Sequence, residues 1–291
     1  MKRREYLELS GAGAAALATV GLGQKLSAVS TAPAIVEEGG PQNPDRWELR
    51  FEDTFASGSL DRASWNIGWG WGRTTTTSPM VVTDSNVFVS QEQLHLQGTH
   101  NCKNVWSGVV NTKDTVTFGP ESYIEAKLKF ARRVGFLNAF WTKPNDEEWP
   151  PEIDVVELIQ RGDKRTESHV STHNLHYSAS TKPGDSSTYR RIGGEYEPEG
   201  ELTEEFNIYG VEWRADTLIH YVNGQAIIKW VNETMLEAMR EGAPFYLLLS
   251  LNIDHVGTAD RSESWGEALV CDWVRVWDRS PEMNESAGSQ N

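Results

Sequence analysis

Three carboxylates stand close together in residues 152–157, EIDVVE, inside an otherwise apolar run. Side chains of a strand alternate between its two faces, so Glu152 and Asp154 share one face. In a regular strand Glu157 would fall on the opposite face. A β-bulge that absorbs one extra residue around Val155 and Val156 brings Glu157 back to the face of the other two, and bulges are frequent beside active sites. The segment therefore predicts a bulged strand with three acids on one face.

Such a trio has the groups needed for a double displacement at a sugar. With the bulge, the Cα atoms of Glu152 and Glu157 lie roughly 13 Å apart at ~3.3 Å per strand step. Side chains that lean together reach the ~5 to 5.5 Å separation of a retaining glycosidase. Neighbouring negative charges raise one another's pKa, so the cluster keeps a proton near neutral pH. We assign Glu152 as the ionised nucleophile, Glu157 as the protonated general acid and later base, and Asp154 as the group that tunes both. The alternative is an acidic edge strand that faces water.

The elements that must position this trio are strands. Apolar and period-two runs recur along the chain and are separated by Gly, Asn, Pro and Asp turns. Asn223-Gly224 predicts a tight hairpin turn. One helix is expected from Glu233 to Arg240, capped by Asn232, ended by Gly242 and packed on the outside. The expected strands are Gln93 to Gly98, Ser122 to Ala131, Phe136 to Trp141, Glu152 to Ile159, Phe206 to Trp213, Leu218 to Val222, Gln225 to Lys229, Phe245 to Asn252 and Ala268 to Trp277.

Composition narrows the class of protein. The 291 residues carry a formal charge of −15, and residues 1–40 hold four basic and four acidic side chains that cancel, so the charge survives loss of this segment. An acidic surface disfavours nucleic acid and anionic membranes as partners and fits a soluble protein adapted to high salt. The chain has twelve tryptophans, some of which must lie in the core. Flat aromatic faces also bind pyranose rings, so a cleft lined by tryptophan is expected if the ligand is a polysaccharide. Cys102 and Cys271 are two independent thiols or one bridge.

The N-terminus resembles an export signal. Lys2-Arg3-Arg4 precedes a weakly apolar Gly/Ala stretch through Gly23, which is typical of a twin-arginine signal. An ordinary secretory signal and a retained anchor are the alternatives, although the apolar stretch is short for a membrane span. We expect a signal peptide and linker in residues 1–40, one β-domain in residues 41–279 and a disordered tail in residues 280–291. The mature protein is then secreted and extracellular.

Residues 149–157, WPPEIDVVE, resemble the signature of glycoside hydrolase family 16 in the bulged form of its laminarinase-like and agarase-like members. Lichenase-type members have a shorter form without the bulge. The similarity covers residues of about 47 to 278. Further stretches that resemble the family in the same order are residues 49–55, 60–61, 65, 123–128, 139–141, 209–213, 221–224 and 272–277.

This resemblance implies an all-β, concanavalin A-like jelly-roll sandwich with a concave glycan cleft. It also implies a retaining endo-β-glucanase that cleaves internal β-1,3 or mixed β-1,3/1,4 linkages of a polysaccharide without a catalytic cofactor. We expect this enzyme to be secreted and monomeric. Within the enzyme class the alternatives are an algal galactan hydrolase, of the agarase or carrageenase type, and a transglycosylase. A β-glucan-binding protein without catalysis is the alternative from another class, and the intact trio disfavours it.

Aromatic residues are the candidates for sugar binding. Trp69 and Trp71 lie in a glycine-rich loop that suits the rim of a cleft, although either can instead fill the core. Trp141 and Trp149 flank the trio and are candidate sugar platforms. His176 matches the family's His-aromatic pair and is a candidate for contact with substrate or with the acids.

The sequence contains two candidate sites for a metal ion. On a helix, His169, His173 and His176 would share a face and could bind a metal, but the β-branched residues around them favour a strand, which separates His173 from His176. The family resemblance also implies a structural calcium held by Asp272 and by backbone carbonyls near Thr54 and Glu92. Here the chain departs from its relatives, which usually have Asp-Gly where it has Gln91-Glu92. It also lacks the arginine that many relatives carry after Gly108.

Overall fold

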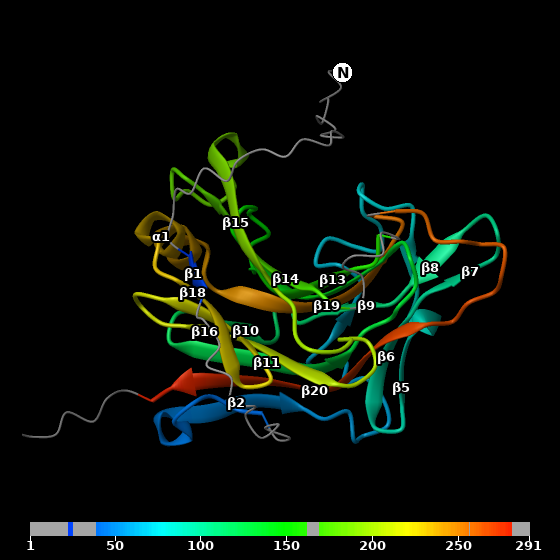
Figure 1. The fold of residues 1–291 in the computed structure, drawn as a ribbon, viewed down its shortest axis with the longest axis horizontal. Coiled ribbons are helices and arrows are strands. Elements are labelled where there is room, and N and C mark those ends of the chain that lie inside the picture. Colours follow the sequence, from blue (N-terminus) through cyan, green and yellow to red (C-terminus); the bar gives the residue numbers. More distant parts are fainter. Residues whose placement is uncertain (1–22, 26–38, 162–168, 256, 281–291) are drawn as a thin grey trace, which may run out of the picture.

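The computed structural model describes residues 23–25, 39–161, 169–255 and 257–280, so the expectations for residues 1–22 and 281–291 lie outside it. Two antiparallel sheets pack face to face (Figure 1). The back sheet has the order β1-β18-β17-β16-β11-β20-β6-β5, with β2 beside β20. The cleft sheet has the order β15-β14-β13-β12-β19-β9-β3, with β10 beside β19. The predicted all-β jelly-roll sandwich is confirmed.

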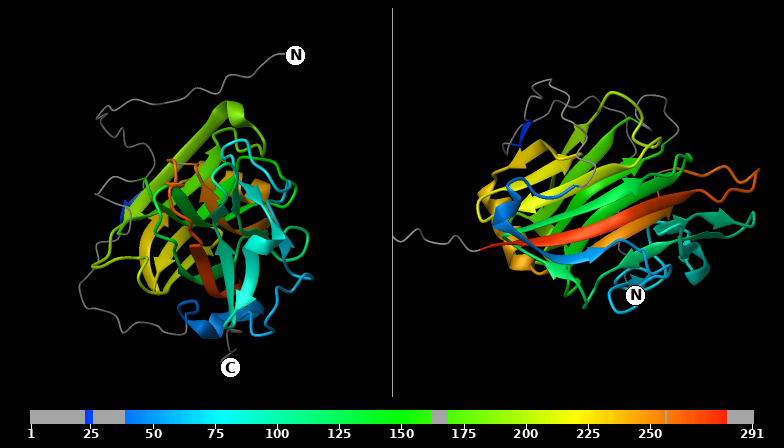
Figure 2. Two further views of the ribbon diagram at one scale, coloured as in Figure 1. Left: turned by 90° about the vertical axis from the view of Figure 1, so that its right-hand side faces the viewer. Right: turned by 90° about the horizontal axis from the view of Figure 1, so that it is seen from below.

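A small third sheet, β4-β8-β7, lies at one end of the sandwich (Figure 1). Figure 2 shows the strands of the two main sheets running in similar directions, with the cyan and teal segments gathered at this end. The back sheet contains β1 (Gly23–Lys25), β2 (Trp47–Asp53), β5 (Val87–Ser90), β6 (Gln93–Gln97), β11 (Ser122–Lys129), β16 (Asn207–Trp213), β17 (Leu218–Val222), β18 (Gln225–Trp230) and β20 (Ala268–Arg279). The cleft sheet contains β3 (Asn66–Ile67), β9 (Val109–Asn111), β10 (Thr117–Phe118), β12 (Phe136–Pro144), β13 (Glu152–Ile159), β14 (Ser171–Ser178), β15 (Tyr189–Tyr196) and β19 (Phe245–Ile253). The third sheet contains β4 (Val81–Val82), β7 (Thr99–His100) and β8 (Val105–Ser107).

All nine strands expected from the sequence are present, with ends that differ by a few residues. The Asn223-Gly224 turn joins β17 to β18, and both residues have positive φ, 49° and 73°. Gln91 and Glu92 form an equally tight turn between β5 and β6, with φ of 54° and 58°. The backbone at this position therefore keeps a two-residue hairpin although neither residue is glycine.

The single α-helix of the described residues is α1 (Glu233–Gly242), and Asn232 caps it by accepting a 2.9 Å hydrogen bond from the backbone N–H of Met235. The helix lies at one end of the sandwich, outside the two sheets, as predicted (Figure 1). Its apolar face, with Met235, Leu236 and Met239, is buried in the main core. Short 3₁₀ turns span Pro44–Arg46, Asp84–Asn86 and Ser186–Thr188.

The core lies between the two main sheets. From β13 it receives Ile153, Val155, Val156 and Leu158, all fully buried. This leaves the acids of the same strand on the other face. Cys102 is exposed and Cys271 is buried, and both are free thiols. In the described part of the chain, no helix has the length and apolar character to cross a membrane.

Candidate active site

The catalytic strand contains the predicted bulge. Against β12, Asp154 pairs with Trp141 and Val156 pairs with Phe140, so Val155 is the extra residue. Against β14, the register jumps between the Asp154–Asn174 pair and the Glu157–Thr172 pair. The parity change places Glu152, Asp154 and Glu157 on one face while Val155 and Val156 both enter the core, as the sequence indicated.

Glu152 is held by the residues around it. The chain enters β13 through two cis prolyl bonds, Trp149-Pro150 and Pro150-Pro151. The indole Nε1–H of Trp149 donates to Oε2 of Glu152 at 3.0 Å. Nε2 of His176 lies 3.5 Å from Oε1 of the same carboxyl. Both oxygens of the expected nucleophile thus face a donor, which fixes the direction of the carboxyl group.

Asp154 is the most buried acid of the trio, with 4 % of its surface exposed. Nε2 of His176 lies 3.0 Å from its Oδ2, and Nδ1 of the same ring lies 2.7 Å from the hydroxyl of Tyr189. If Tyr189 donates to Nδ1, then Nε2 carries the hydrogen and donates to Asp154. The prediction that His176 contacts the acids agrees with this geometry.

Glu157 is oriented from β14. The side-chain amide of Asn174 donates to Oε2 of Glu157 at 2.7 Å. A Cβ atom at Gly193 of the neighbouring strand would lie 2.1 Å from Oδ1 of Asn174. Glycine at position 193 therefore leaves the space in which Asn174 reaches Glu157. The sequence analysis did not single out Asn174 or Gly193.

Burial changes the acidity of two of the acids. It raises the pKa of Glu152 to about 8, with a further contribution from the charge of Asp154, whereas His176 acts in the opposite direction. Burial and the charge of Glu157 also raise the pKa of Asp154 well above its ordinary value. The prediction that the cluster retains a proton near neutral pH agrees with these shifts, but they lie on Glu152 and Asp154, whereas the sequence analysis placed the proton on Glu157.

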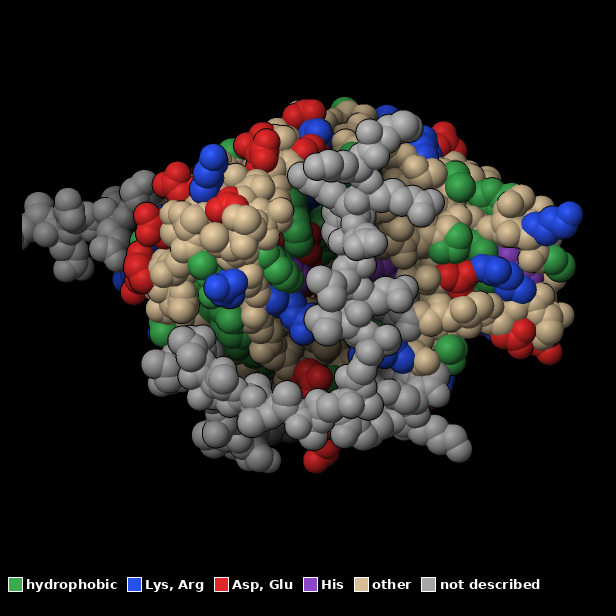
Figure 3. Space-filling view, turned by 90° about the horizontal axis from the view of Figure 1, so that it is seen from above, with side chains coloured by type: hydrophobic (Ala, Val, Ile, Leu, Met, Phe, Trp, Pro, Cys, Tyr) green, Lys and Arg blue, Asp and Glu red, His purple; other side chains and the backbone are tan. Residues whose placement is uncertain are grey.

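The trio lies in a cleft of about 390 Å³. Figure 3 looks onto this side of the molecule and shows acidic and histidine side chains inside the hollow. The cleft is lined by Trp69, Trp71, Thr75, Thr77, Leu137, Ala139, Trp141, Lys143, Trp149, Glu152, Asp154, Glu157, Asn252 and His255. Four tryptophans thus surround the acids, as predicted for a glycan cleft.

These four tryptophans differ in exposure. Trp71 is 46 % exposed and Trp149 is 37 % exposed, so both offer surface to a ligand. Trp69 is only 5 % exposed, and its ring stacks on that of Trp71 with centroids 5.4 Å apart. Trp69 therefore mainly fills the core beneath Trp71. Trp141 is partly buried, and its Nε1–H donates to Ser250 at 3.1 Å.

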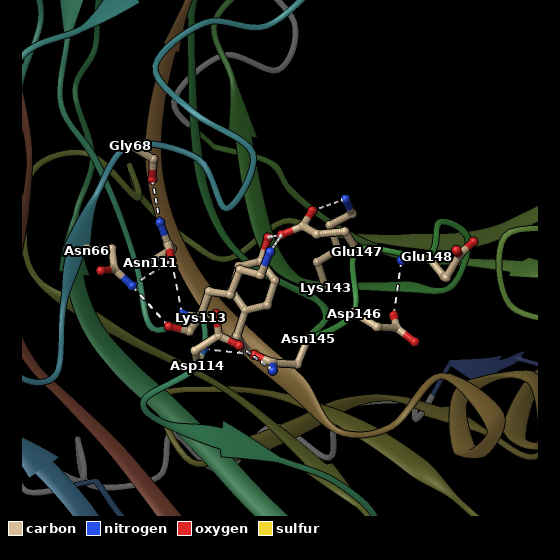
Figure 4. Close-up of polar contacts among 11 residues, drawn as sticks. Asn66, Gly68, Asn111, Lys113, Asp114, Lys143, Asn145, Asp146, Glu147 and Glu148 are labelled. Atoms are coloured by element: carbon tan, nitrogen blue, oxygen red, sulfur yellow. Dashed lines mark hydrogen bonds and ion pairs between the residues drawn. The ribbon is translucent and has the colours of Figure 1, made fainter.

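A polar network supports the loop that carries Trp71 (Figure 4). Glu147 forms ion pairs with Lys113, at 3.1 Å, and with Lys143. The hydroxyl of Tyr246 donates a hydrogen bond to Glu147 at 2.9 Å. Nζ of Lys143 lies 4.6 Å from the ring centroid of Trp71, a cation–π contact. A Cβ atom at Gly70 would lie 2.2 Å from Oε1 of Glu147, so the loop requires glycine there to rest on this network.

Two groups of residues bear on metal binding. Glu152, Asp154 and His176 each offer a ligand atom within 4.8 Å of the others. Among the described residues, these three form the group that could hold a metal ion. Asp272, the expected calcium ligand, does not fit that role. Nζ of Lys127 lies 2.9 Å from its Oδ2, and the amide of Gln93 donates to its Oδ1 at 2.9 Å. An ammonium group thus takes the place of a cation at Asp272.

The three histidines of the alternative metal site are separated. His169 is exposed and lies 3.1 Å from the carbonyl of Gly200, His173 is buried in the core, and His176 joins the acids. The alternation of a strand produces this separation, as expected. What the sequence analysis missed is that His173, together with His220, contacts the backbone of the bulge.

A sandwich whose concave face carries a carboxylate trio under tryptophans is the arrangement of a glycoside hydrolase. Residues 47–279 match the family profile described as the GH16 domain of β-porphyranases A–D. The chain therefore belongs to glycoside hydrolase family 16, as the sequence resemblance indicated.

Similar proteins are β-glycanases by name. The chain is 23 % identical to the endo-1,3-1,4-β-glycanase EglC of Rhizobium meliloti over 82 % of its length and 48 % of that protein. It thus spans about half the length of the curated relatives it matches. The laminarinase catalytic domain of Thermotoga petrophila aligns with a TM-score of 0.66 at 23 % identity, covering 81 % of this chain and 99 % of that one. A GH16 protein of Bacteroides ovatus in complex with a mixed-linkage glucan product aligns with a TM-score of 0.65 at 20 % identity, covering 78 % and 99 %. At these identities the structural matches establish the fold.

Proposed function

We propose that this protein is an endo-acting β-glucanase that cleaves internal β-1,3 or mixed β-1,3/1,4 linkages with retention of configuration. The observation that carries the proposal is the bulge in β13, which gathers Glu152, Asp154 and Glu157 on the floor of a tryptophan-lined cleft. The names of the similar proteins, β-glycanase and laminarinase, support a glucan as the substrate.

The reaction needs two glutamates with complementary roles. Glu157 carries a proton of its own, in addition to the one that Asp154 and Glu152 share. Glu152 attacks the anomeric carbon while Glu157 gives this proton to the glycosidic oxygen, and the bond to the leaving sugar breaks. Glu157 then removes a proton from water, which attacks the glycosyl ester and frees Glu152. Two inversions leave the configuration unchanged. The hydrogen bonds from Trp149 to Glu152 and from Asn174 to Glu157 hold both groups in direction for these steps.

Glu152 must be ionised to attack, although burial raises its pKa to about 8. We propose that Asp154, the most buried of the three, keeps the shared proton and donates it in a hydrogen bond to Glu152. His176 assists, because its Nε2 lies within 3.5 Å of both carboxyl groups. Asp154 thereby holds Glu152 as the carboxylate while the pair keeps only one negative charge.

A galactan hydrolase is the second candidate, because the matching profile is that of β-porphyranases. Porphyran is a sulfated galactan, and binding sulfate calls for cationic groups that are free to pair with it. Among the described residues that line the cleft, Lys143 is the one lysine or arginine, and it is already paired with Glu147. This charge distribution favours a neutral glucan over a sulfated galactan.

A substrate panel tests the proposal. The purified protein is incubated with laminarin, lichenan, agarose, carrageenan and porphyran, and the products are sized while the anomer first released is identified by NMR. We expect short oligosaccharides in the β configuration from laminarin or lichenan. Release of the α anomer would overturn the retaining mechanism, and cleavage of porphyran alone would replace the glucanase with the second candidate.

One substitution separates catalysis from binding. Glu152→Gln removes the nucleophile but keeps the shape of the side chain, so we expect hydrolysis to fall by at least about 10³-fold while glucan binding persists. Full activity of this variant would refute the assignment of Glu152. A wild-type protein that binds glucan but cleaves no member of the panel would support the non-catalytic alternative instead.

We also propose that the protein is exported through its twin-arginine segment, on the basis of Arg3 and Arg4 and the apolar stretch that follows. Replacing both arginines by lysine should retain the protein inside the cell. Unchanged export of this variant in a host that has both export routes would point to an ordinary secretory signal.

A further inference from the structure

Two buried histidines contact the bulge of β13 from the core side. His173 lies on β14 of the cleft sheet and His220 on β17 of the back sheet, and both are fully buried. Their rings meet edge to face with centroids 5.3 Å apart. Nε2 of His220 lies 3.0 Å from the carbonyl oxygen of Asp154, and Nδ1 of His173 lies 2.6 Å from that of Val155.

These two carbonyls belong to the residues where the bulge interrupts the ladder. A bulge leaves backbone groups unpaired, and a buried carbonyl without a partner costs about 1 to 3 kcal/mol. A carbonyl only accepts hydrogen bonds, so each histidine must donate from the nitrogen that faces it. The donors therefore are Nε2–H of His220 and Nδ1–H of His173.

The second nitrogen of each ring also has a partner. The indole Nε1–H of Trp230 lies 3.0 Å from Nδ1 of His220 and can only donate, so this Nδ1 carries no hydrogen. The hydroxyl of Ser171 lies 3.0 Å from Nε2 of His173, and because burial lowers the pKa of His173 to about 4, this nitrogen carries no hydrogen and accepts from the hydroxyl. Both rings are thus neutral, each with one defined tautomer. Burial lowers the pKa of both histidines and so also favours their neutral forms.

The apolar pattern alone does not decide where the bulge lies. Val155 and Val156 are both buried and have the same side chain, so the extra residue could be either one without exposing an apolar group. A shift of the bulge by one residue would nevertheless change which carbonyls leave the ladder, and with them the orientation of the neighbouring acids. Hydrogen bonds to two named carbonyls distinguish the two positions.

We propose that His173 and His220 are positioning residues that fix the bulge at Val155 and thereby set the directions of Asp154 and Glu157. They touch neither substrate nor the reacting atoms. Trp230 acts one step further out, because its indole can only donate and so leaves Nε2 of His220 as the nitrogen that donates. The effect on catalysis rests on the proposed function, whereas the tautomers do not.

The first test is independent of activity. In ¹⁵N-histidine-labelled wild-type protein at neutral pH, NMR should show His220 as the Nε2–H tautomer and His173 as the Nδ1–H tautomer. Trp230→Phe removes the indole donor together with part of the ring volume and should move His220 toward a mixture of tautomers. A protonated ring or the opposite tautomer in the wild type would overturn the proposal, whatever the enzyme does with glycans.

The second test uses a matched tryptophan. Trp213 is fully buried in the back sheet, and its Nε1–H has no hydrogen-bond partner, so Trp213→Phe makes the same change of volume without touching the histidines. We expect kcat to fall several-fold in Trp230→Phe with KM within about twofold, and to stay near the wild-type value in Trp213→Phe. Equal kcat in the two variants would refute the positioning role.

Substitution of His220 itself provides a rescue experiment. His220→Leu cannot donate to Asp154, and misplacement of a reacting group by ~1 Å can cost about 10²-fold in rate. His220→Gln offers both a donor and an acceptor and should recover part of kcat. If glutamine performs no better than leucine while both variants melt cooperatively, the hydrogen bond is not what positions the acids. Failure of the proposed function would instead appear as an inactive wild type with the expected tautomers.

Discussion

The raised pKa of Glu152 predicts that removing its charge stabilises the protein. The pKa rises from the ordinary 4.5 to about 8, first because of burial and then because of the charge of Asp154. A group whose pKa is raised on folding favours the folded state fully below pH 4.5, and this contribution is lost as pH rises toward about 8. At ~1.4 kcal/mol per unit, the raised pKa makes folding about 3 kcal/mol less favourable at pH 7 than below pH 4.5.

Glu152→Gln keeps the shape of the side chain but cannot ionise. It weakens the hydrogen bond from Trp149, which subtracts about 1 kcal/mol. The net gain at pH 7 is therefore about 2 kcal/mol, or a rise in melting temperature of about 4 to 8 °C for a domain of this size. At pH 4, where the wild-type carboxyl is protonated, the variant should be equal to or slightly less stable than the wild type.

The assay is thermal and urea unfolding of both proteins at pH 4, 5.5, 7 and 8.5. Glu147→Gln is the matched control, because the pairs with Lys143 and Lys113 outweigh burial and lower the pKa of Glu147. This variant should lose stability above pH 4.5 and approach the wild type below it. If Glu152→Gln gains nothing between pH 4 and pH 8.5, the reasoning that burial raises the pKa of Glu152 is refuted.

The other predictions concern the cleft loop and Asp272. Trp71→Ala should raise KM and change the unfolding free energy by less than about 1 kcal/mol, because the side chain is half exposed. Trp69→Ala should lower the unfolding free energy by about 3 to 5 kcal/mol through the cavity it leaves. The reverse ranking in urea unfolding would contradict the assignment of Trp69 to the core and of Trp71 to the cleft. Because Lys127 already pairs with Asp272, millimolar calcium and EDTA should give melting temperatures within about 1 °C of each other, and a clear rise with calcium would show that the ammonium group is displaced.

Much of the fold could be predicted because its signals are local. Hairpin residues such as Asn223-Gly224 define turns, and alternation of apolar and polar residues defines strands. Both can therefore be predicted without knowing which strands pair. The helix at Glu233 was found from its cap for the same reason. The sequence did not show which end of the sandwich the helix covers, because this depends on the sheets around it. Met235 and Met239 of the buried helix face pack into the core at that end.

The site was predictable to the extent that it lies in one strand. The parity conflict at Glu157 indicated a bulge, and the structure contains it. Which residue is extra, and which side chains hold it, depend on β14 and β17, and neighbours across sheets leave no mark on the sequence of β13. Trp69 and Trp71 illustrate the same limit. They lie in one glycine-rich loop, yet Trp69 is buried and Trp71 is exposed, and only the packing of the loop decides which is which. The raised pKa of Glu152 likewise reflects burial first, which spacing alone does not show, and the charge of Asp154 second.

The position of Val155 has an evolutionary consequence. Loss of that single codon would leave the order E-I-D-V-E, in which plain alternation already keeps all three acids on the cleft side and both aliphatic residues in the core. The bulged and unbulged signatures are therefore one in-frame deletion apart, and a lineage can pass between them without an intermediate that turns an acid inward. The step would leave the two glutamates four strand steps apart, as the bulged strand does, and would deprive the His173 ring of its acceptor. Compensating changes on β14 should accompany it.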